Sequence, residues 1–115
     1  AVYEGSWKNN LQNGKGKYTW ANGDIYDGEW KDGKMDGAGI MRQADGVKFK
    51  GSFKAGLKEG YGILEDSDGI RYEGTFREGQ KDGEFVEKDR NGNLIRKVKY
   101  VNGLVESVSE LTSAQ

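Results

Sequence analysis

The sequence contains no cysteine, no histidine and no proline. The absence of cysteine excludes a disulfide framework and a thiol nucleophile, and it suits a cytoplasmic protein. The absence of histidine removes the commonest general base and a common metal ligand. Carboxylates are plentiful, but they recur at equivalent places along the chain instead of forming one acid and base pair. We therefore expect a protein that is not an enzyme and that holds no metal and no cofactor.

Long apolar runs and an excess of charge of one sign are also missing. No stretch approaches the roughly 20 residues of a membrane span, and the opening AVYEGSWKNN lacks the features of a signal peptide. The 18 basic and 19 acidic residues give a net charge of -1, which provides no electrostatic footprint for DNA or RNA. The first residue is not methionine, which suggests a fragment of a longer protein. We expect neither a nucleic-acid partner nor a small-molecule substrate.

Glycine is abundant, at 19 of 115 residues, whereas hydrophobic residues make up only 34% of the chain. A two-layer domain of this length would be short of apolar side chains for its core, so a thinner architecture is expected. Glycines and aromatic residues recur together at a period of 23 residues. Each unit, numbered from its first aromatic residue, has aromatics at positions 1 and 5 and glycines at positions 3, 12, 14 and 21. The fourth unit departs from this pattern at position 14, where Phe85 replaces glycine.

Each unit has the pattern of one β-hairpin. Aromatic and polar residues alternate over positions 1 to 5, which is typical of a strand with one apolar face. A turn sequence such as Asp32-Gly33 follows that strand, and a second one such as Asn22-Gly23 closes the unit. The repeats therefore predict successive hairpins joined into an antiparallel meander.

The register follows from the loop lengths, because directly paired residues in an antiparallel sheet point to the same side. A two-residue first loop at positions 8 and 9 places Trp30 opposite Gly37, where the missing Cβ lets the ring lie across the backbone. A loop at positions 7 and 8 would change the partners but not the side. A three-residue second loop pairs position 16 with position 1 of the next unit. The expected pairs are Tyr18 with Tyr26, Met41 with Phe49, and Leu64 with Tyr72.

The expected sheet has one aromatic face and one charged face. The aromatic face is the candidate partner-binding groove, formed by Tyr3, Trp7, Tyr18, Tyr26, Trp30, Met41, Phe49, Phe53, Leu64, Tyr72 and Phe76. The opposite face carries charges of both signs and is expected to be solvated. At position 6 it carries a basic ladder, a candidate contact for anionic lipid, formed by Lys8, Lys31, Lys54 and Arg77.

The string YDGEWKDGKMDGAGIM, from Tyr26 to Met41, resembles the MORN repeat, named for membrane occupation and recognition nexus. Related strings recur in register, namely YEGSWKNNLQNGKGKY, FKGSFKAGLKEGYGIL and YEGTFREGQKDGEFVE. The resemblance covers residues 3 to 94. It implies an elongated single-layer β-sheet used in scaffolds, in cytoskeletal and membrane-linked complexes, or as an accessory module on a larger enzyme. Phospholipid binding, protein binding and dimerisation are the activities that the family implies.

We expect an all-β fold, an elongated single-layer antiparallel meander of tandem β-hairpin repeats with a short helical cap at the C-terminus. Residues 1–94 are expected to form four full repeats, and residues 95–106 a degenerate fifth that ends the array. Residues 107–115 are the expected capping tail.

A helical pattern in the tail supports that cap. Leu104, Val108 and Leu111 have helical spacing, and Ser107 with Glu110 fits a capping box. The alternatives for the tail are a dimerisation element and a mimic of the natural ligand.

The expected function is a non-catalytic scaffold that binds a protein partner, as a peptide or helix, or a second copy of the chain along the groove. Most rings could instead be structural and covered within the sheet. The tail is too short to cover a single layer of this length, so part of the aromatic face should remain exposed. The alternative is an anionic-phospholipid-binding or membrane-targeting module that regulates an attached catalytic domain. Either function fits the cytoplasm, peripheral to a membrane or to the cytoskeleton.

Overall fold

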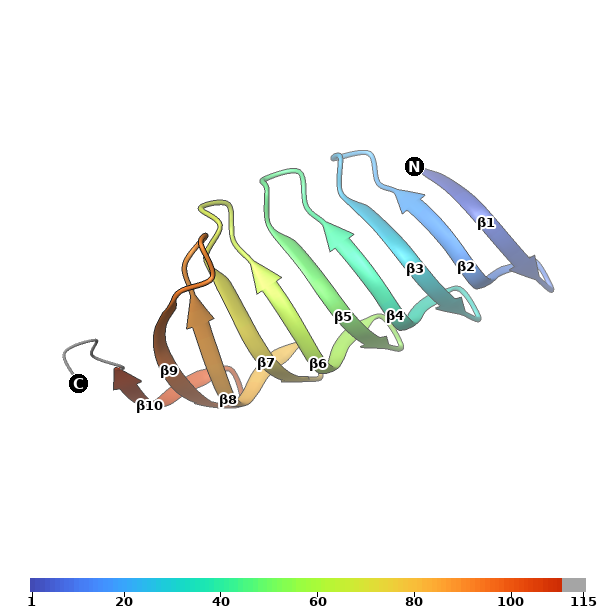
Figure 1. Ribbon diagram of the computed structural model, residues 1–115. Helices are drawn as coiled ribbons and strands as arrows, with labels where there is room; N and C mark the ends of the chain where they lie inside the picture. The colour runs from blue at the N-terminus through green and yellow to red at the C-terminus, as the bar shows by residue number, and fades with distance from the viewer. Residues whose placement is uncertain (111–115) are drawn as a thin grey trace.

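The computed structural model describes residues 1–110, which form one open sheet of ten strands in sequence order (Figure 1). All neighbouring strands are antiparallel, which confirms the expected single-layer meander. The strands are β1 Val2–Lys8, β2 Leu11–Thr19, β3 Ile25–Lys31, β4 Lys34–Arg42, β5 Lys48–Lys54, β6 Leu57–Glu65, β7 Arg71–Arg77, β8 Gln80–Lys88, β9 Leu94–Val101 and β10 Leu104–Glu110. Residues 1–110 include no helix that is long and apolar enough to cross a membrane.

The first turn of each hairpin is a two-residue loop at positions 7 and 8 of the repeat. In the second hairpin, Lys31 pairs with Lys34 across Asp32 and Gly33, whose φ angles are 49° and 84°. A type I′ turn requires two left-handed residues of this kind, and its twist matches the twist of the flanking strands. The loop therefore lies one residue earlier than the preferred expectation of positions 8 and 9.

The second turn has the expected three-residue loop. The Trp20 N–H donates to the Asp24 carbonyl at 2.9 Å, and the Gly23 N–H donates to the Trp20 carbonyl at 3.0 Å. Gly23 adopts a φ of 97°, which closes the loop in the left-handed region. Position 16 consequently pairs with position 1 of the next repeat, and the structure confirms the pairs Tyr18 with Tyr26, Met41 with Phe49, and Leu64 with Tyr72.

A bulge in the second strand of each full repeat changes the partner of the ring at position 5. Gly28 pairs with Gly39 but Trp30 pairs with Met35. The two pairs are two residues apart in β3 and four residues apart in β4, so β4 contains the bulge. The prediction that Trp30 lies opposite Gly37 within its own hairpin is therefore wrong. The expected register was derived from the loop lengths alone, and loop lengths do not reveal two extra residues bulged within a strand.

The bulge explains why position 12 is glycine. Gly37 has a φ of 101°, and a Cβ at this position would come 2.8 Å from a carboxylate oxygen of Glu29. Residues other than glycine are strained in this conformation. Gly37 faces Phe53 of the next hairpin, just as Gly14 faces Trp30. The glycine therefore serves the following repeat, not the ring of its own repeat.

The last described segment is a strand instead of the expected helix. β10 pairs with β9 from Leu104 to Glu110, with a bulge between Val105 and Ser107. The helical cap is therefore wrong for residues 107–110, and residues 111–115 lie outside the described part of the chain. Pairing with β9 satisfies a row of backbone groups at once, which a single local capping box does not match. β10 also runs across the boundary that was expected after residue 106.

The described sheet is elongated. Its principal extents are 57, 24 and 19 Å. The Cα radius of gyration is 15.9 Å, compared with about 13 Å for a compact domain of this length. β1 and β10 lie at opposite ends of the long axis, where each has a neighbour on one side only among the described residues (Figure 1).

Candidate functional site

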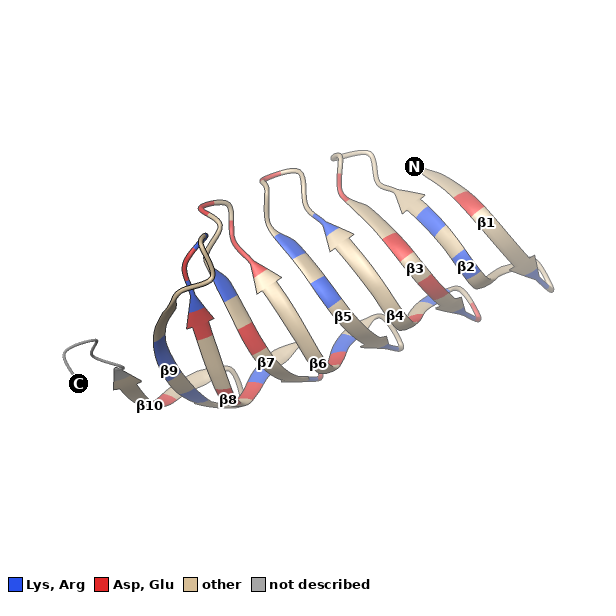
Figure 2. Ribbon diagram, viewed as in Figure 1, with Lys and Arg blue, Asp and Glu red and all other residues tan. Residues whose placement is uncertain are grey.

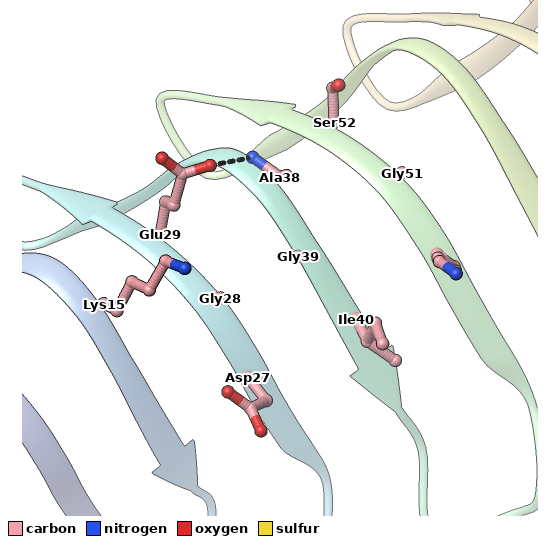
Figure 3. Close-up of a pocket in the computed structure, with 10 residues that line it drawn as sticks. Lys15, Asp27, Gly28, Glu29, Ala38, Gly39, Ile40, Gly51 and Ser52 are labelled. Atoms are coloured by element: carbon pink, nitrogen blue, oxygen red, sulfur yellow. Dashed lines mark hydrogen bonds between the residues drawn. The ribbon is translucent and has the colours of Figure 1, made fainter.

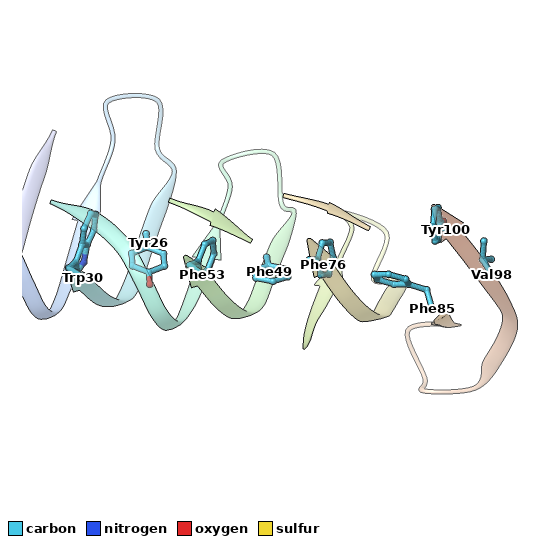
Figure 4. Close-up of a cluster of buried hydrophobic side chains, with 8 residues drawn as sticks. All are labelled: Tyr26, Trp30, Phe49, Phe53, Phe76, Phe85, Val98 and Tyr100. Carbon is cyan, nitrogen blue, oxygen red and sulfur yellow. The ribbon is translucent and has the colours of Figure 1, made fainter. Parts of the chain in front are cut away.

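Aromatic residues, which in the first three repeats are those at positions 1 and 5, lie in one row on the same side of the sheet, which we call the ring face (Figure 4). Consecutive rings meet edge to face, with centroids 4.8 to 5.5 Å apart and interplanar angles of 77° to 89°. Pairs of this geometry contribute about 0.5–1.5 kcal/mol each beyond the burial of their area. The order of the row is Trp7, Tyr3, Trp30, Tyr26, Phe53, Phe49, Phe76, Phe85 and Tyr100.

Paired glycines beneath the position 1 rings allow these rings to lie flat against the backbone. Gly28 and Gly39 pair beneath Tyr26, and a Cβ on Gly39 would collide with atoms of the Tyr26 ring. The Tyr26 hydroxyl donates to the Glu29 carbonyl at 2.9 Å, which anchors the ring over the glycines. Burial raises the pKa of Tyr26 to about 12. The glycines that admit a ring are thus at positions 3 and 14.

The position 5 ring connects neighbouring repeats. Trp30 lies against Tyr26 of its own repeat and Tyr3 of the preceding one. Its indole N–H donates to the carbonyl of Gly16 at 3.0 Å in a buried hydrogen bond. Since Gly16 belongs to the preceding hairpin, each such ring fixes one repeat onto the next.

The predicted groove residues fall into three groups by exposure. Five rings are buried, namely Tyr26, Trp30, Phe49, Phe53 and Phe76. Five other side chains are partly buried and pack against these rings, namely Tyr3, Tyr18, Met41, Leu64 and Tyr72. Only Trp7 of the predicted set is largely exposed, at 57%. A single layer therefore buries most of its aromatic rings without a second layer, because the rings and their flanking side chains cover one another.

Sequence reasoning missed three core residues at the C-terminal end of the row. Phe85, Val98 and Tyr100 are buried and belong to the same core as the rings of the full repeats. Phe85 occupies the position 14 that is glycine elsewhere, and it takes the place in the row that Tyr72 would have held. Tyr72 is displaced, and its hydroxyl donates to Asp66 at 3.1 Å. The loss of glycine at Phe85 was the signal for this exchange.

A cluster of charged side chains lies beside the displaced ring. The Lys81 ammonium is 4.2 Å from the centroid of the Tyr72 ring and 4.9 Å from that of Tyr100. Burial lowers the pKa of Lys81, and burial with the Asp66 hydrogen bond raises the pKa of Tyr72 to about 12. The cluster closes the end of the ring row with cation–π contacts.

Glu87 and Arg96 form an ion pair at the same end. Arg96 Nε lies 2.8 Å from Oε1 of Glu87, whose side chain is buried. Glu87 Oε2 is buried without a hydrogen-bond partner among residues 1–110. Glu87 pairs with Arg96 between β8 and β9 at the place equivalent to the pair of Leu64 with Tyr72 between β6 and β7. An ionic contact therefore replaces an apolar one in the fifth hairpin.

The predicted basic ladder is exposed along one side of the sheet. Lys8, Lys31, Lys54 and Arg77 each end the first strand of a hairpin. Acidic residues follow closely, as with Asp32 after Lys31 and Glu78 after Arg77, and Figure 2 shows both signs intermixed along the sheet. The ladder is therefore accessible, but it does not form a surface of one sign.

A pocket of about 530 Å³ lies on the polar face, the side of the sheet opposite the rings (Figure 3). Its floor includes the backbone of Gly28, Gly39 and Gly51, which belong to neighbouring strands and carry no side chains. Its walls are Lys15, Asp27, Glu29, Ala38, Ile40, Lys50 and Ser52. The Glu29 carboxylate accepts a hydrogen bond from the Ala38 N–H at 2.7 Å, which holds the wall across the bulge of β4.

The pocket offers mixed chemistry to a ligand. It has basic, acidic and apolar groups within reach of one another over a floor of strand backbone. This composition suits an extended polypeptide more than a small anionic ligand. In residues 1–110, no three Asp or Glu side chains are arranged to hold a metal ion.

Comparison with known proteins identifies the repeat. The family model of the MORN repeat matches residues 3–25, 26–48, 49–71 and 72–93, in agreement with the period found in the sequence. Each match starts at the position 1 aromatic residue of a structural hairpin. No curated protein matches the chain.

Proposed function

Because the chain belongs to the MORN repeat family, we propose that it is a non-catalytic scaffold module that binds a protein partner. The observation that carries this proposal is the glycine-floored pocket on the polar face. The rings of the ring face mostly bury one another, so they hold the scaffold together and leave little ring surface for a partner. The polar-face pocket instead combines open volume with varied side-chain chemistry.

The partner that best fits the pocket is an extended segment with charges of both signs and one apolar side chain. Lys15 and Lys50 would form ion pairs with acidic side chains of the partner, whereas Asp27 would form one with a basic side chain. Ile40 provides an apolar contact between them. Surface ion pairs of this kind add specificity and association rate more than affinity, so the proposed binding is selective and of moderate strength.

Ala38→Tyr tests the proposal by filling the pocket. Position 13 of the repeat is Ala38 in the second unit and Tyr61 in the third, where the ring is 60% exposed, so the fold accepts a tyrosine at this position. Affinity capture from a native extract, followed by quantitative mass spectrometry, should recover proteins that bind the natural chain and are depleted about tenfold or more by Ala38→Tyr.

Glu84→Tyr is the matched control, because Glu84 is exposed at the same repeat position but lies outside the pocket. It should retain the captured proteins. Equal capture by the natural chain and both variants would contradict a role for the pocket.

The exposed basic ladder carries the alternative, binding to an anionic membrane surface. Each basic group near such a surface adds about 1 kcal/mol, but the interspersed acidic groups offset part of this attraction. Sedimentation with vesicles containing phosphatidylserine, at physiological ionic strength, distinguishes the two functions. Protein that remains in the supernatant contradicts the membrane alternative and leaves the protein-binding proposal in place.

A further inference from the structure

The fourth repeat surrounds the ammonium of Lys81 with three aromatic rings, which we call the cage. The ammonium lies 4.2 Å from the ring centroid of Tyr72 on β7 and 4.9 Å from that of Tyr100 on β9. The ring centroid of Phe85, which is on β8 like Lys81 itself, is 5.8 Å away. All three distances are within the range of about 6 Å over which an aromatic ring attracts a cation. Rings from three neighbouring strands therefore contact the same cation.

The cage exists because the fourth repeat departs from the glycine pattern. Phe85 stands where the other full repeats have the glycine that lies beneath their position 1 ring. Tyr72 is displaced from the row, and Asp66 accepts a hydrogen bond from its hydroxyl at 3.1 Å. Lys58 occupies the same repeat position as Lys81 in the third unit, and among residues 1–110 its ammonium lies over one ring, that of Phe49, at 5.3 Å. The displaced Tyr72 thus supplies a wall that the third unit lacks.

The polar groups around the cage are not satisfied within the described part of the chain. The Lys81 ammonium forms no ion pair and no hydrogen bond within residues 1–110. Glu87 is 4% exposed, and its Oε2 has no hydrogen-bond partner there either. Tyr72 pairs with Glu87 across β7 and β8, so this carboxylate faces the same side of the sheet as the cage. Burial lowers the pKa of Lys81, whereas the charges of Glu87 and Asp66 act to raise it, so the surroundings favour a cation.

We propose that the cage is a recognition site for a methylated lysine side chain of a protein partner, and that Lys81 occupies it in the free protein. The occupant shows which chemistry the cage accepts, since the Lys81 ammonium stands in for that of the partner. Methylation keeps the positive charge of an ammonium. It also replaces N–H groups, which find no acceptor beside Lys81, with methyl groups that pack against aromatic rings. The cage lies on the ring face, so this binding is independent of the pocket on the polar face.

Lys81 can leave the cage while β8 stays in the sheet. Its pairing with Phe76 is made by the backbone, and the four-carbon stem of a lysine is flexible. The side chain is partly exposed, so its ammonium has access to solvent. The equivalent residue is Gln12 in the first unit and Met35 in the second, so the hairpin does not need a cation at this position.

The charges beside the cage favour the exchange of Lys81 for another cation. Withdrawal of Lys81 leaves the carboxylates of Asp66 and Glu87 beside the guanidinium of Arg96, which is 2.8 Å from Oε1 of Glu87. Negative charge is then in excess and attracts the ammonium of a partner. The apparent affinity of the natural chain is reduced by the fraction of molecules in which Lys81 fills the cage, so removal of Lys81 should strengthen binding.

Lys81→Ala tests the proposal by emptying the cage. The probe is trimethyllysine with both backbone termini blocked, and the measurement is the change in chemical shift of the Tyr72 and Tyr100 ring protons during a titration. The dissociation constant should fall about tenfold or more relative to the natural chain, because Lys81 no longer competes. Adding Tyr72→Leu to Lys81→Ala should weaken binding about tenfold, because one wall of the cage is lost.

Lys58→Ala is the matched control, since it makes the same change beside a single ring. It should bind the probe no more tightly than the natural chain. The uncharged analogue of the probe, with a tert-butyl group in place of the trimethylammonium, should bind Lys81→Ala about tenfold more weakly than the probe does. Ala38→Tyr, which fills the polar-face pocket, should leave binding of the probe unchanged, so the two sites are tested separately.

Thermal unfolding followed by circular dichroism verifies that each variant is folded. If Lys81→Ala is unfolded, Lys81→Gln provides the same test, because Gln12 occupies this position in the first unit. A folded variant without the Lys81 ammonium that does not bind trimethyllysine overturns the proposal. Equal binding by Lys58→Ala also overturns it. So does equal binding of the tert-butyl analogue, which would indicate an apolar contact without recognition of a cation.

Discussion

At the residue scale, the repeat is built on the exclusion of Cβ atoms from beneath aromatic rings. A Cβ on Gly28 would come 2.6 Å from the carbonyl oxygen of Ala38 and 2.7 Å from the Tyr26 hydroxyl. Gly39, its partner, is covered by the same ring. The exception supports the rule, because Phe85 can occupy position 14 only where Tyr72 has moved out of the row. The glycines and rings therefore act as one packing unit.

Gly39→Ala is expected to destabilise the protein by about 1–3 kcal/mol, because the new methyl group must displace the Tyr26 ring or the backbone. Thermal unfolding followed by circular dichroism measures the loss. Ala38→Ser is the control, since this neighbour is exposed on the polar face and should change the free energy of unfolding by less than about 0.5 kcal/mol. An unchanged melting temperature for Gly39→Ala would show that the ring does not need the glycine.

At the element scale, each hairpin is joined to the preceding one by recurring contacts of its first turn. The turn glycines Gly33, Gly56, Gly79 and Gly103 each donate a backbone hydrogen bond of 2.9 or 3.0 Å to the preceding hairpin. This contact recurs in the fifth hairpin, although its sequence has lost the position 3 glycine and the position 1 ring. The hairpin therefore keeps its place in the sheet with a different set of side chains, including the Glu87 and Arg96 ion pair.

Arg96→Ala should destabilise the protein because it leaves the Glu87 carboxylate buried without its cation. The expected loss is about 1–3 kcal/mol, below that of a fully buried pair because the Arg96 side chain is 43% exposed. Replacing both residues, as Glu87→Leu with Arg96→Tyr, gives this place the same residue types as the pair of Leu64 with Tyr72. The double variant should be at least as stable as the natural protein.

Urea unfolding of the three proteins measures these differences. Glu106→Ala is the control, because its ion pair with Lys99 is half-exposed and should contribute less than about 1 kcal/mol. If the double replacement is as unstable as Arg96→Ala, the ion pair stabilises the hairpin by more than its geometry suggests.

At the scale of the whole molecule, the protein is close to a one-dimensional array. Each strand contacts its sequence neighbours, and the ring row runs the length of the sheet without a covering layer among residues 1–110. Stability in such an array is the sum of repeat and interface contributions, so the ends are held by fewer contacts than the middle. The exposed Trp7 at one end and the exposed Leu104 at the other reflect the same asymmetry.

Hydrogen exchange should therefore proceed from the ends of the array inward. At a low protein concentration, where association is minimal, the amides of β1 and β10 should exchange first and those of β4 to β7 last. Peptide-resolved mass spectrometry measures this order. Uniform protection along the chain would contradict an array and indicate a single cooperative unit.

The sequence by itself determined the hairpin, the second-turn register and the two faces of the sheet. These features depend on neighbouring residues and on a period that repeats them, as in the confirmed pairing of Tyr18 with Tyr26. Only the tertiary structure decided the partners within a hairpin, because a bulge in β4 places Met35 instead of Gly37 opposite Trp30, which leaves Trp30 opposite a glycine of the preceding hairpin alone. It also decided that residues 104–110 form a strand, since the open edge of β9 offers more backbone hydrogen bonds than a short helix could. Local patterns specify local geometry, whereas the packing of rings and the pairing of edges depend on what each neighbouring hairpin leaves uncovered.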